Sequence, residues 1–146
     1  MRTRLPYLCL TVVLGCAATA DNANLVTSVK TFNESMRWKR FQAAASFIPV
    51  TGRSSFLSRY RDTEEDLSIE SIEIRNMELQ ETGGVQQAMV TVVSRSYLLP
   101  STVLTTTRMT QHWELKNGAW LLTKTINELV PLQPATDQAR PPAPKT

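Results

Sequence analysis

The most informative part of this chain for its fold is residues 111–122, which read Gln111-His112-Trp113-Glu114-Leu115-Lys116-Asn117-Gly118-Ala119-Trp120-Leu121-Leu122. Asn-Gly favours a two-residue type I′ turn, which fixes the register of the strands on either side. Pairing Lys116 with Ala119 gives one apolar face, made of the pairs Leu115–Trp120, Trp113–Leu122 and Met109–Ile126. The opposite face is mixed and polar, with the pairs His112–Thr123, Glu114–Leu121 and Thr110–Thr125. We therefore predict a hairpin with one buried face.

The same alternation extends toward the N-terminus and predicts a sheet. Four runs of strand-forming residues cover 68–80, 85–98, 103–115 and 119–129, separated by the turn pairs Gly83-Gly84, Pro100-Ser101 and Asn117-Gly118. A two-residue turn at Pro100-Ser101 would bring Ala88, Val90 and Val92 onto the same apolar face. In the first run the apolar positions change from even to odd numbers, which indicates a bulge near Arg75-Asn76. The pattern is that of a four-stranded antiparallel meander.

Helical spacing precedes these strands. Apolar residues recur every three or four positions, at Leu25, Val29, Phe32, Met36, Phe41, Ala45 and Ile48. We predict one long helix or two abutting helices over 23–47, ended by Pro49 and Gly52. A short second helix follows, capped by Ser54 or Ser55, with an apolar face of Phe56, Leu57 and Tyr60.

The chain begins with an apparent export signal. Arg2 and Arg4 precede an apolar run from Leu5 to Leu14, which ends at Gly15-Cys16. Val13-Leu14-Gly15-Cys16 resembles the lipobox of bacterial lipoprotein precursors, in which the cysteine receives a lipid and a peptidase cuts before it. The resemblance implies acylation at Cys16, attachment to a membrane and, because Ala17 is not acidic, the outer membrane facing the periplasm. Cleavage after Ala20 is the alternative, and it would release a soluble secreted protein.

Charge and composition narrow the function classes. The 146 residues carry a formal net charge of +3, but loss of Arg2 and Arg4 with the signal leaves 14 basic and 13 acidic residues. A net charge of +1 argues against nucleic acid as a partner. The last residues, 130–146, are rich in proline and predict a disordered tail. We thus divide the chain into a signal (1–15), a lipidated Cys16 with a tether (16–22), one domain (23–129) and the tail.

The order of helix, short helix and long meander, closing with the hairpin at 111–122, is similar to the NTF2-like superfamily. The resemblance implies an α+β fold in which an N-terminal helix pair packs on a curved four-stranded antiparallel sheet to form a cone. Cystatin-like folds share this order of elements. In the superfamily, including its SnoaL-like and DUF4440-like branches, the mouth of the cone is an active site in some proteins and a binding pocket or oligomer scaffold in others.

Few residues are candidates for chemistry. His112, the only histidine, is a weak catalytic candidate, because the predicted register puts it on the outer face of the sheet. Trp113, Trp120 and Met109 could line a small-molecule pocket inside the cone. We expect no cofactor and no metal site, since one histidine and two N-terminal cysteines, Cys9 and Cys16, offer no ligand set.

Two charged clusters have simple structural explanations. The acidic run 62–66 lacks the ligand spacing of a calcium loop, so we interpret it as a solvated helix end. Arg37, Lys39 and Arg40 around Trp38 form a basic-aromatic group that could touch lipid head groups or a nucleic acid, although an ordinary helix face explains it as well.

Three functional hypotheses follow. The first is a non-catalytic envelope lipoprotein whose domain binds a small ligand or assembles with a second copy or another envelope protein. The second is a SnoaL-like acid–base enzyme, an isomerase or hydrolase, with His112 as the base. The third is a soluble secreted binding protein that starts at Asp21.

Overall fold

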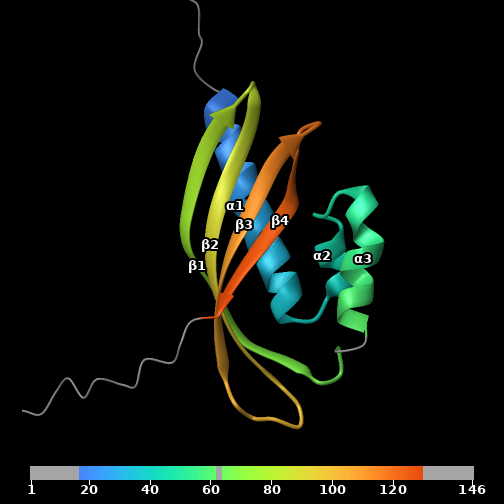
Figure 1. The fold of residues 1–146 in the computed structure, drawn as a ribbon. Helices are drawn as coiled ribbons and strands as arrows, with labels where there is room; N and C mark the ends of the chain where they lie inside the picture. The colour runs from blue at the N-terminus through green and yellow to red at the C-terminus, as the bar shows by residue number, and fades with distance from the viewer. Residues whose placement is uncertain (1–16, 62–63, 130–146) are drawn as a thin grey trace, which may run out of the picture.

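A computed structural model describes residues 17–61 and 64–129 of the chain, with side chains from residue 24 to residue 128. The predicted signal, Cys16 and the proline-rich tail lie outside the described residues. The elements are α1 (Ala17–Arg37), α2 (Phe41–Ala45), α3 (Val50–Arg61), β1 (Leu67–Thr82), β2 (Val85–Leu98), β3 (Thr105–Lys116) and β4 (Ala119–Leu129). The three helices lie on one face of a single curved sheet (Figure 1).

The sheet confirms the predicted meander. All neighbouring strands are antiparallel, and their order is β1-β2-β3-β4. We call the face that the helices cover the inner face and the opposite one the outer face. This arrangement of a helix layer on a four-stranded antiparallel sheet is the predicted α+β architecture.

Helix α1 begins six residues before the predicted start, so residues 17–22, which we expected to form a tether, are helical. Three of these six residues, Ala17, Ala18 and Ala20, are strong helix formers. The apolar stripe predicted from spacing is confirmed, since Leu25, Val29, Phe32 and Met36 are all buried. Lys39, with a φ of 54°, turns the chain between α1 and α2, so the predicted 23–47 region forms two helices.

Helix α3 begins at Val50, before the serines that we expected to cap it. Pro49 sets a backbone angle suited to a helix start, and its carbonyl accepts a 2.8 Å hydrogen bond from the Gly52 N–H. The prediction that Gly52 ends a helix was wrong, because it lies inside α3. A Cβ there would stand 3.2 Å from Cγ2 of Ile48, so the close approach of α3 to Ile48 explains the glycine.

Two of the three predicted turns are confirmed as two-residue turns. Asn117 and Gly118 have φ of 51° and 78°, and Gly83 and Gly84 have φ of 61° and 78°. These positive angles match a type I′ hairpin turn. Pro100-Ser101 was wrongly expected to form such a turn, and residues 99–104 make a longer loop instead. Proline cannot adopt the positive φ that this turn needs.

The pairing of β2 with β3 nevertheless follows the predicted register. Ala88 pairs with Trp113 and Val92 pairs with Met109. Ala88, Val90 and Val92 are at most 2% exposed, which confirms that they share the apolar face.

Bulges shift the register in β1 and β4. The predicted bulge near Arg75 is present, and a second register shift lies between Ile69 and Ser71. In β4 the register shifts by one residue beyond the Trp113–Leu122 pair. The predicted pairs His112–Thr123, Thr110–Thr125 and Met109–Ile126 were therefore wrong. The observed partners are Lys124, Ile126 and Asn127, respectively.

The β4 bulge changes which side chains face inward, because a one-residue slip exchanges the two faces of a strand. Asn127 now lies opposite Met109 and Thr125 lies opposite Gln111. Ile126, which was expected to be buried, is 40% exposed. The bulge thus lines one end of the inner face with polar side chains.

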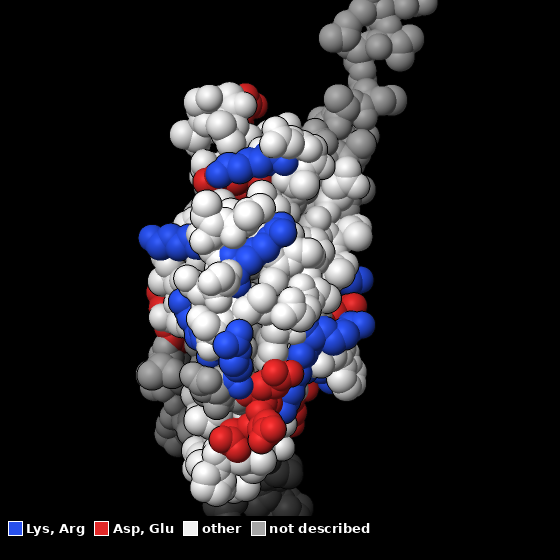
Figure 2. Space-filling model, turned by 90° about the vertical axis from the view of Figure 1, so that its right-hand side faces the viewer, with Lys and Arg blue, Asp and Glu red and all other residues white. Residues whose placement is uncertain are grey.

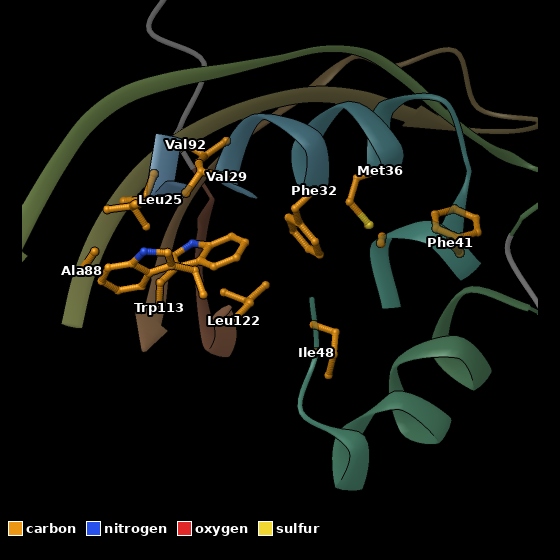
Figure 3. Packing of buried hydrophobic residues seen from close by; sticks show 13 residues of the cluster. Leu25, Val29, Phe32, Met36, Phe41, Ile48, Ala88, Val92, Trp113 and Leu122 are labelled. Carbon is orange, nitrogen blue, oxygen red and sulfur yellow. The ribbon is translucent and has the colours of Figure 1, made fainter. Parts of the chain in front are cut away.

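The core lies between α1 and the inner face. Trp113 is fully buried, Trp120 is 2% exposed, and the side chains of Leu25, Val29 and Phe32 approach them from α1 (Figure 3). No helix in the described part of the chain is long and apolar enough to cross a membrane.

Gly118 provides a test of the hairpin turn. A side chain at its φ of 78° is strained, while the space around it is open, so strain is the dominant cost of a substitution. We expect Gly118→Ala to lower the free energy of unfolding by about 1–2 kcal/mol. Gly118→Asn should lose less, because asparagine tolerates this region better. Urea denaturation measures both variants, and an equal loss would contradict the explanation.

Candidate ligand pocket

A hollow of about 510 Å³ lies between α1, α3 and the inner face of the sheet. Its volume is in the range that accommodates small-molecule ligands. The apolar wall includes Phe32, Met36, Ile48, Phe56, Ile72 and Leu122. Figure 3 shows Phe32 and Met36 on α1 pointing toward Leu122 and Ile48 on the other side of this space.

A buried group of polar side chains forms the floor of the pocket. Gln111 on β3 and Asn33 on α1 are 2% and 4% exposed. The Gln111 amide donates to Oδ1 of Asn33 at 2.9 Å, and Nδ2 of Asn33 donates to the Val29 carbonyl at 2.8 Å. Nε1 of Trp113 donates to Oε1 of Gln111 at 3.2 Å. These hydrogen bonds join α1 to the sheet and hold the two amides at the pocket.

Aromatic contacts hold α3 over the pocket. None of its side chains is fully buried, but Phe56 and Tyr60 pack on the core from above. Phe32 lies 6.3 Å from Phe56 between ring centroids, and Tyr60 stacks on Phe41 at 4.7 Å. The helix layer therefore covers the apolar wall through ring contacts, which are worth about 0.5–1.5 kcal/mol each beyond their area.

The mouth of the pocket is polar and carries positive charge. Arg59 and Tyr60 come from the last turn of α3, while Ser96, Thr107 and Asn127 come from the sheet. Burial raises the pKa of the Tyr60 hydroxyl, and the neighbouring Arg59 cation partly offsets this effect. Tyr60 is therefore a neutral hydrogen-bonding group near neutral pH. Of the described residues that line the pocket, none is Asp, Glu or His.

Of the three residues predicted to bind a ligand, one lines the pocket and two lie in the core. Met109 lines the pocket. Trp113 and Trp120 are buried in the core, where Trp113 packs edge-on against Phe32 with 5.6 Å between ring centroids. Trp113 acts on the pocket through its hydrogen bond to Gln111.

Sequence reasoning missed Asn33 and Gln111, although both carry a signal. Gln111 stands between Met109 and Trp113 at an inward position of β3, where the alternation calls for an apolar residue. Asn33 follows Phe32 and lies four residues after Val29, within the buried stripe of α1. A polar residue at a core position is the informative exception, because such a group must be hydrogen-bonded.

His112 lies on the outer face, away from the pocket. It pairs with Met89 and Lys124, and its Nε2 is buried without a hydrogen-bond partner among the described residues. It lines a second hollow, of about 340 Å³, together with Gln87 and Glu114. The arrangement does not bring His112 together with the residues of the inner pocket.

Of the acidic run, Asp62 and Thr63 lie outside the described residues. Glu64, Glu65 and Asp66 lie near Lys39 and Arg61, and the Lys39 ammonium donates to the Glu64 carbonyl at 2.8 Å. This contact ties the turn after α1 to the segment after α3.

Comparison with solved structures shows an NTF2-like fold. An NTF2-like protein from Cytophaga hutchinsonii matches with a TM-score of 0.58 and 9% identity, over 75% of this chain and 98% of that one. An NTF2-like protein of unknown function in nutrient uptake from Rhodospirillum rubrum gives 0.57 and 14%, over 73% and 98%. A Caulobacter vibrioides protein with a cystatin-like fold gives 0.51 and 12%, over 76% and 90%. No protein-family model and no curated protein matches the chain.

The buried amide pair can be tested by a double-mutant cycle. Asn33→Leu or Gln111→Leu leaves a partner unpaired in the interior, and we expect each to cost about 1–3 kcal/mol of stability. The double variant should cost less than the two single variants together, because it removes both partners of their hydrogen bonds. Urea denaturation of the four proteins gives the coupling, and strict additivity would argue that the pair is not coupled.

Proposed function

We propose that this chain is a bacterial envelope lipoprotein whose NTF2-like domain binds a small molecule in the pocket between α1, α3 and the sheet. The observation that carries the proposal is the composition of this pocket. An apolar wall, a floor of two amides and a cationic mouth are arranged around one space of about 510 Å³. Such a site suits a small, largely apolar ligand that carries hydrogen-bond acceptors.

The chemistry of the floor supports binding rather than catalysis. Asn33 and Gln111 donate and accept hydrogen bonds, but a carboxamide acts as neither a general acid nor a general base near neutral pH. The acid–base alternative needs His112 as a base inside the cone, whereas His112 lies on the outer face of the sheet. We therefore assign the pocket to recognition.

The start of α1 supports lipidation over cleavage after Ala20. Cutting before Cys16 would keep every described residue of α1, Ala17–Arg37. Cutting after Ala20 would remove its first turn. In this proposal Cys16 is acylated and holds the domain on the outer membrane, facing the periplasm. Stable anchoring of this kind needs more than one acyl chain. The uncovered outer face of the sheet would be the surface for a second copy or another envelope protein.

The pocket can be filled to test binding. Thr107 lines it, whereas the neighbouring Thr106 alternates to the outer face. We expect the full chain to enhance the fluorescence of anilinonaphthalene sulfonate, an apolar aromatic anion, and Thr107→Trp to reduce this enhancement at least about tenfold. Thr106→Trp is the matched control and should keep it. Equal enhancement by both variants would place the probe elsewhere and count against the pocket.

The anchor can be tested independently in bacterial cells. Cys16→Ala should abolish incorporation of radiolabelled palmitate and release the protein from the membrane fraction, because the thiol is the acceptor of the lipid. Cys9→Ala is the control and should leave both unchanged. Unchanged labelling of Cys16→Ala would refute lipidation, and an intact mass beginning at Asp21 would support the soluble alternative.

A further inference from the structure

The helix layer concentrates the positive charge of the molecule. Residues 37–61 contain six basic and no acidic residues: Arg37, Lys39, Arg40, Arg53, Arg59 and Arg61. The sheet region 64–129 has the opposite balance, with five basic and nine acidic residues. Although the net charge of the chain is small, basic residues predominate in the helix layer and acidic residues predominate in the sheet.

Tertiary contacts bring basic residues from different parts of the helix layer together, and Lys39 and Arg61 line one hollow. Stacking of Phe41 on Tyr60 brings the start of α2 beside the end of α3, and so brings Arg40 close to the neighbours of Tyr60. Figure 2 shows Lys and Arg side chains spread over the side of the molecule that carries α2 and α3, with acidic side chains gathered near its lower end. An excess of basic side chains on one side of a molecule creates a local attraction for anions.

Four of these six basic side chains form no ion pair within the described part of the chain. Lys39 and Arg53 are engaged with backbone carbonyls. The remaining four, Arg37, Arg40, Arg59 and Arg61, are exposed and belong to none of the ion pairs found between described residues.

An exposed tryptophan stands in the same group. Trp38 is 64% exposed, and the Arg37 guanidinium lies 5.2 Å from the centre of its ring. The other two tryptophans are buried in the core, whereas Trp38 contributes little to it. Tryptophan beside arginine is the combination that suits the interface between water and lipid, because the indole is amphipathic and the guanidinium meets phosphate.

We propose that this basic-aromatic face, formed by Arg37, Trp38, Arg40, Arg59 and Arg61, binds the surface of an anionic phospholipid bilayer. Long arginine side chains adapt to a fluid layer of phosphates, and Trp38 inserts its ring among the head groups. An acidic polypeptide is the competing partner, but it offers no layer into which Trp38 can insert. The acidic residues Glu64 to Asp66 bound the face at one edge.

Vesicle cosedimentation of the full chain tests the charge. We compare vesicles of phosphatidylcholine with and without phosphatidylglycerol, and use the ratio of the two partition coefficients, which cancels any contribution of the apolar N-terminal run. Arg37→Gln with Arg40→Gln should lower this ratio about twenty-five-fold, at about fivefold for each charge removed. Added salt should lower the ratio for the unmodified chain.

Arg95→Gln with Arg108→Gln is the matched control. These residues are exposed on the outer face, so the variant loses the same net charge from the opposite side. Its ratio should remain close to that of the unmodified chain. Equal losses in both double variants would overturn the proposal, because net charge alone would then explain the attraction.

Fluorescence tests the insertion of Trp38. Anionic vesicles should shift the tryptophan emission to shorter wavelength, since Trp38 is the exposed ring and Trp113 and Trp120 are already buried. Trp38→Phe should lose this shift. Binding to polyglutamate together with no shift on anionic vesicles would show an acidic polypeptide site and overturn the membrane proposal. These readouts use no pocket ligand and no Cys16 variant, so they succeed or fail independently of the proposed function.

Discussion

The packing of Phe32 on Trp113 is the contact on which the rest of the structure depends. The two rings meet edge to face, 5.6 Å apart, and join the C-terminal part of α1 to the C-terminal part of β3. Phe32 also contacts Phe47, in the segment between α2 and α3, and Phe56 of α3, so one side chain meets both of these parts of the helix layer. The indole N–H of Trp113 then fixes Gln111, and Gln111 fixes Asn33. The core, the helix layer and the pocket floor are therefore connected through Phe32 and Trp113.

Much of the fold could be predicted from the sequence because the relevant patterns are local. Asn117-Gly118 defined a turn, and the alternation around it identified Trp113 and Leu122 as inward residues, as observed. The bulge in β4 could not be predicted, because Thr123 follows the alternation as well as any neighbour. Tertiary contacts select it: the Leu122 N–H donates to the Phe47 carbonyl, which bonds the edge of β4 to the helix layer.

The candidate site was less accessible to sequence reasoning. Met109 was nominated for its apolar character and does line the pocket, but its position depends on the cover that α3 provides. The floor consists of Asn33 and Gln111, which are 78 residues apart in sequence. The sequence shows that each is a polar residue at a core position, but it does not show that their side chains form a hydrogen bond with each other. Such pairings are properties of the tertiary structure.

The bulges in β1 hinder edge-to-edge pairing between the sheets of two copies of the protein. β1 is an edge strand of 16 residues, and a flat edge of that length is a template for pairing with another sheet. Its two register shifts twist and interrupt the row of free backbone groups, and charged side chains such as Glu73, Arg75 and Glu78 stand along the strand. The strand is therefore a poor template for pairing with the sheet edge of a second copy.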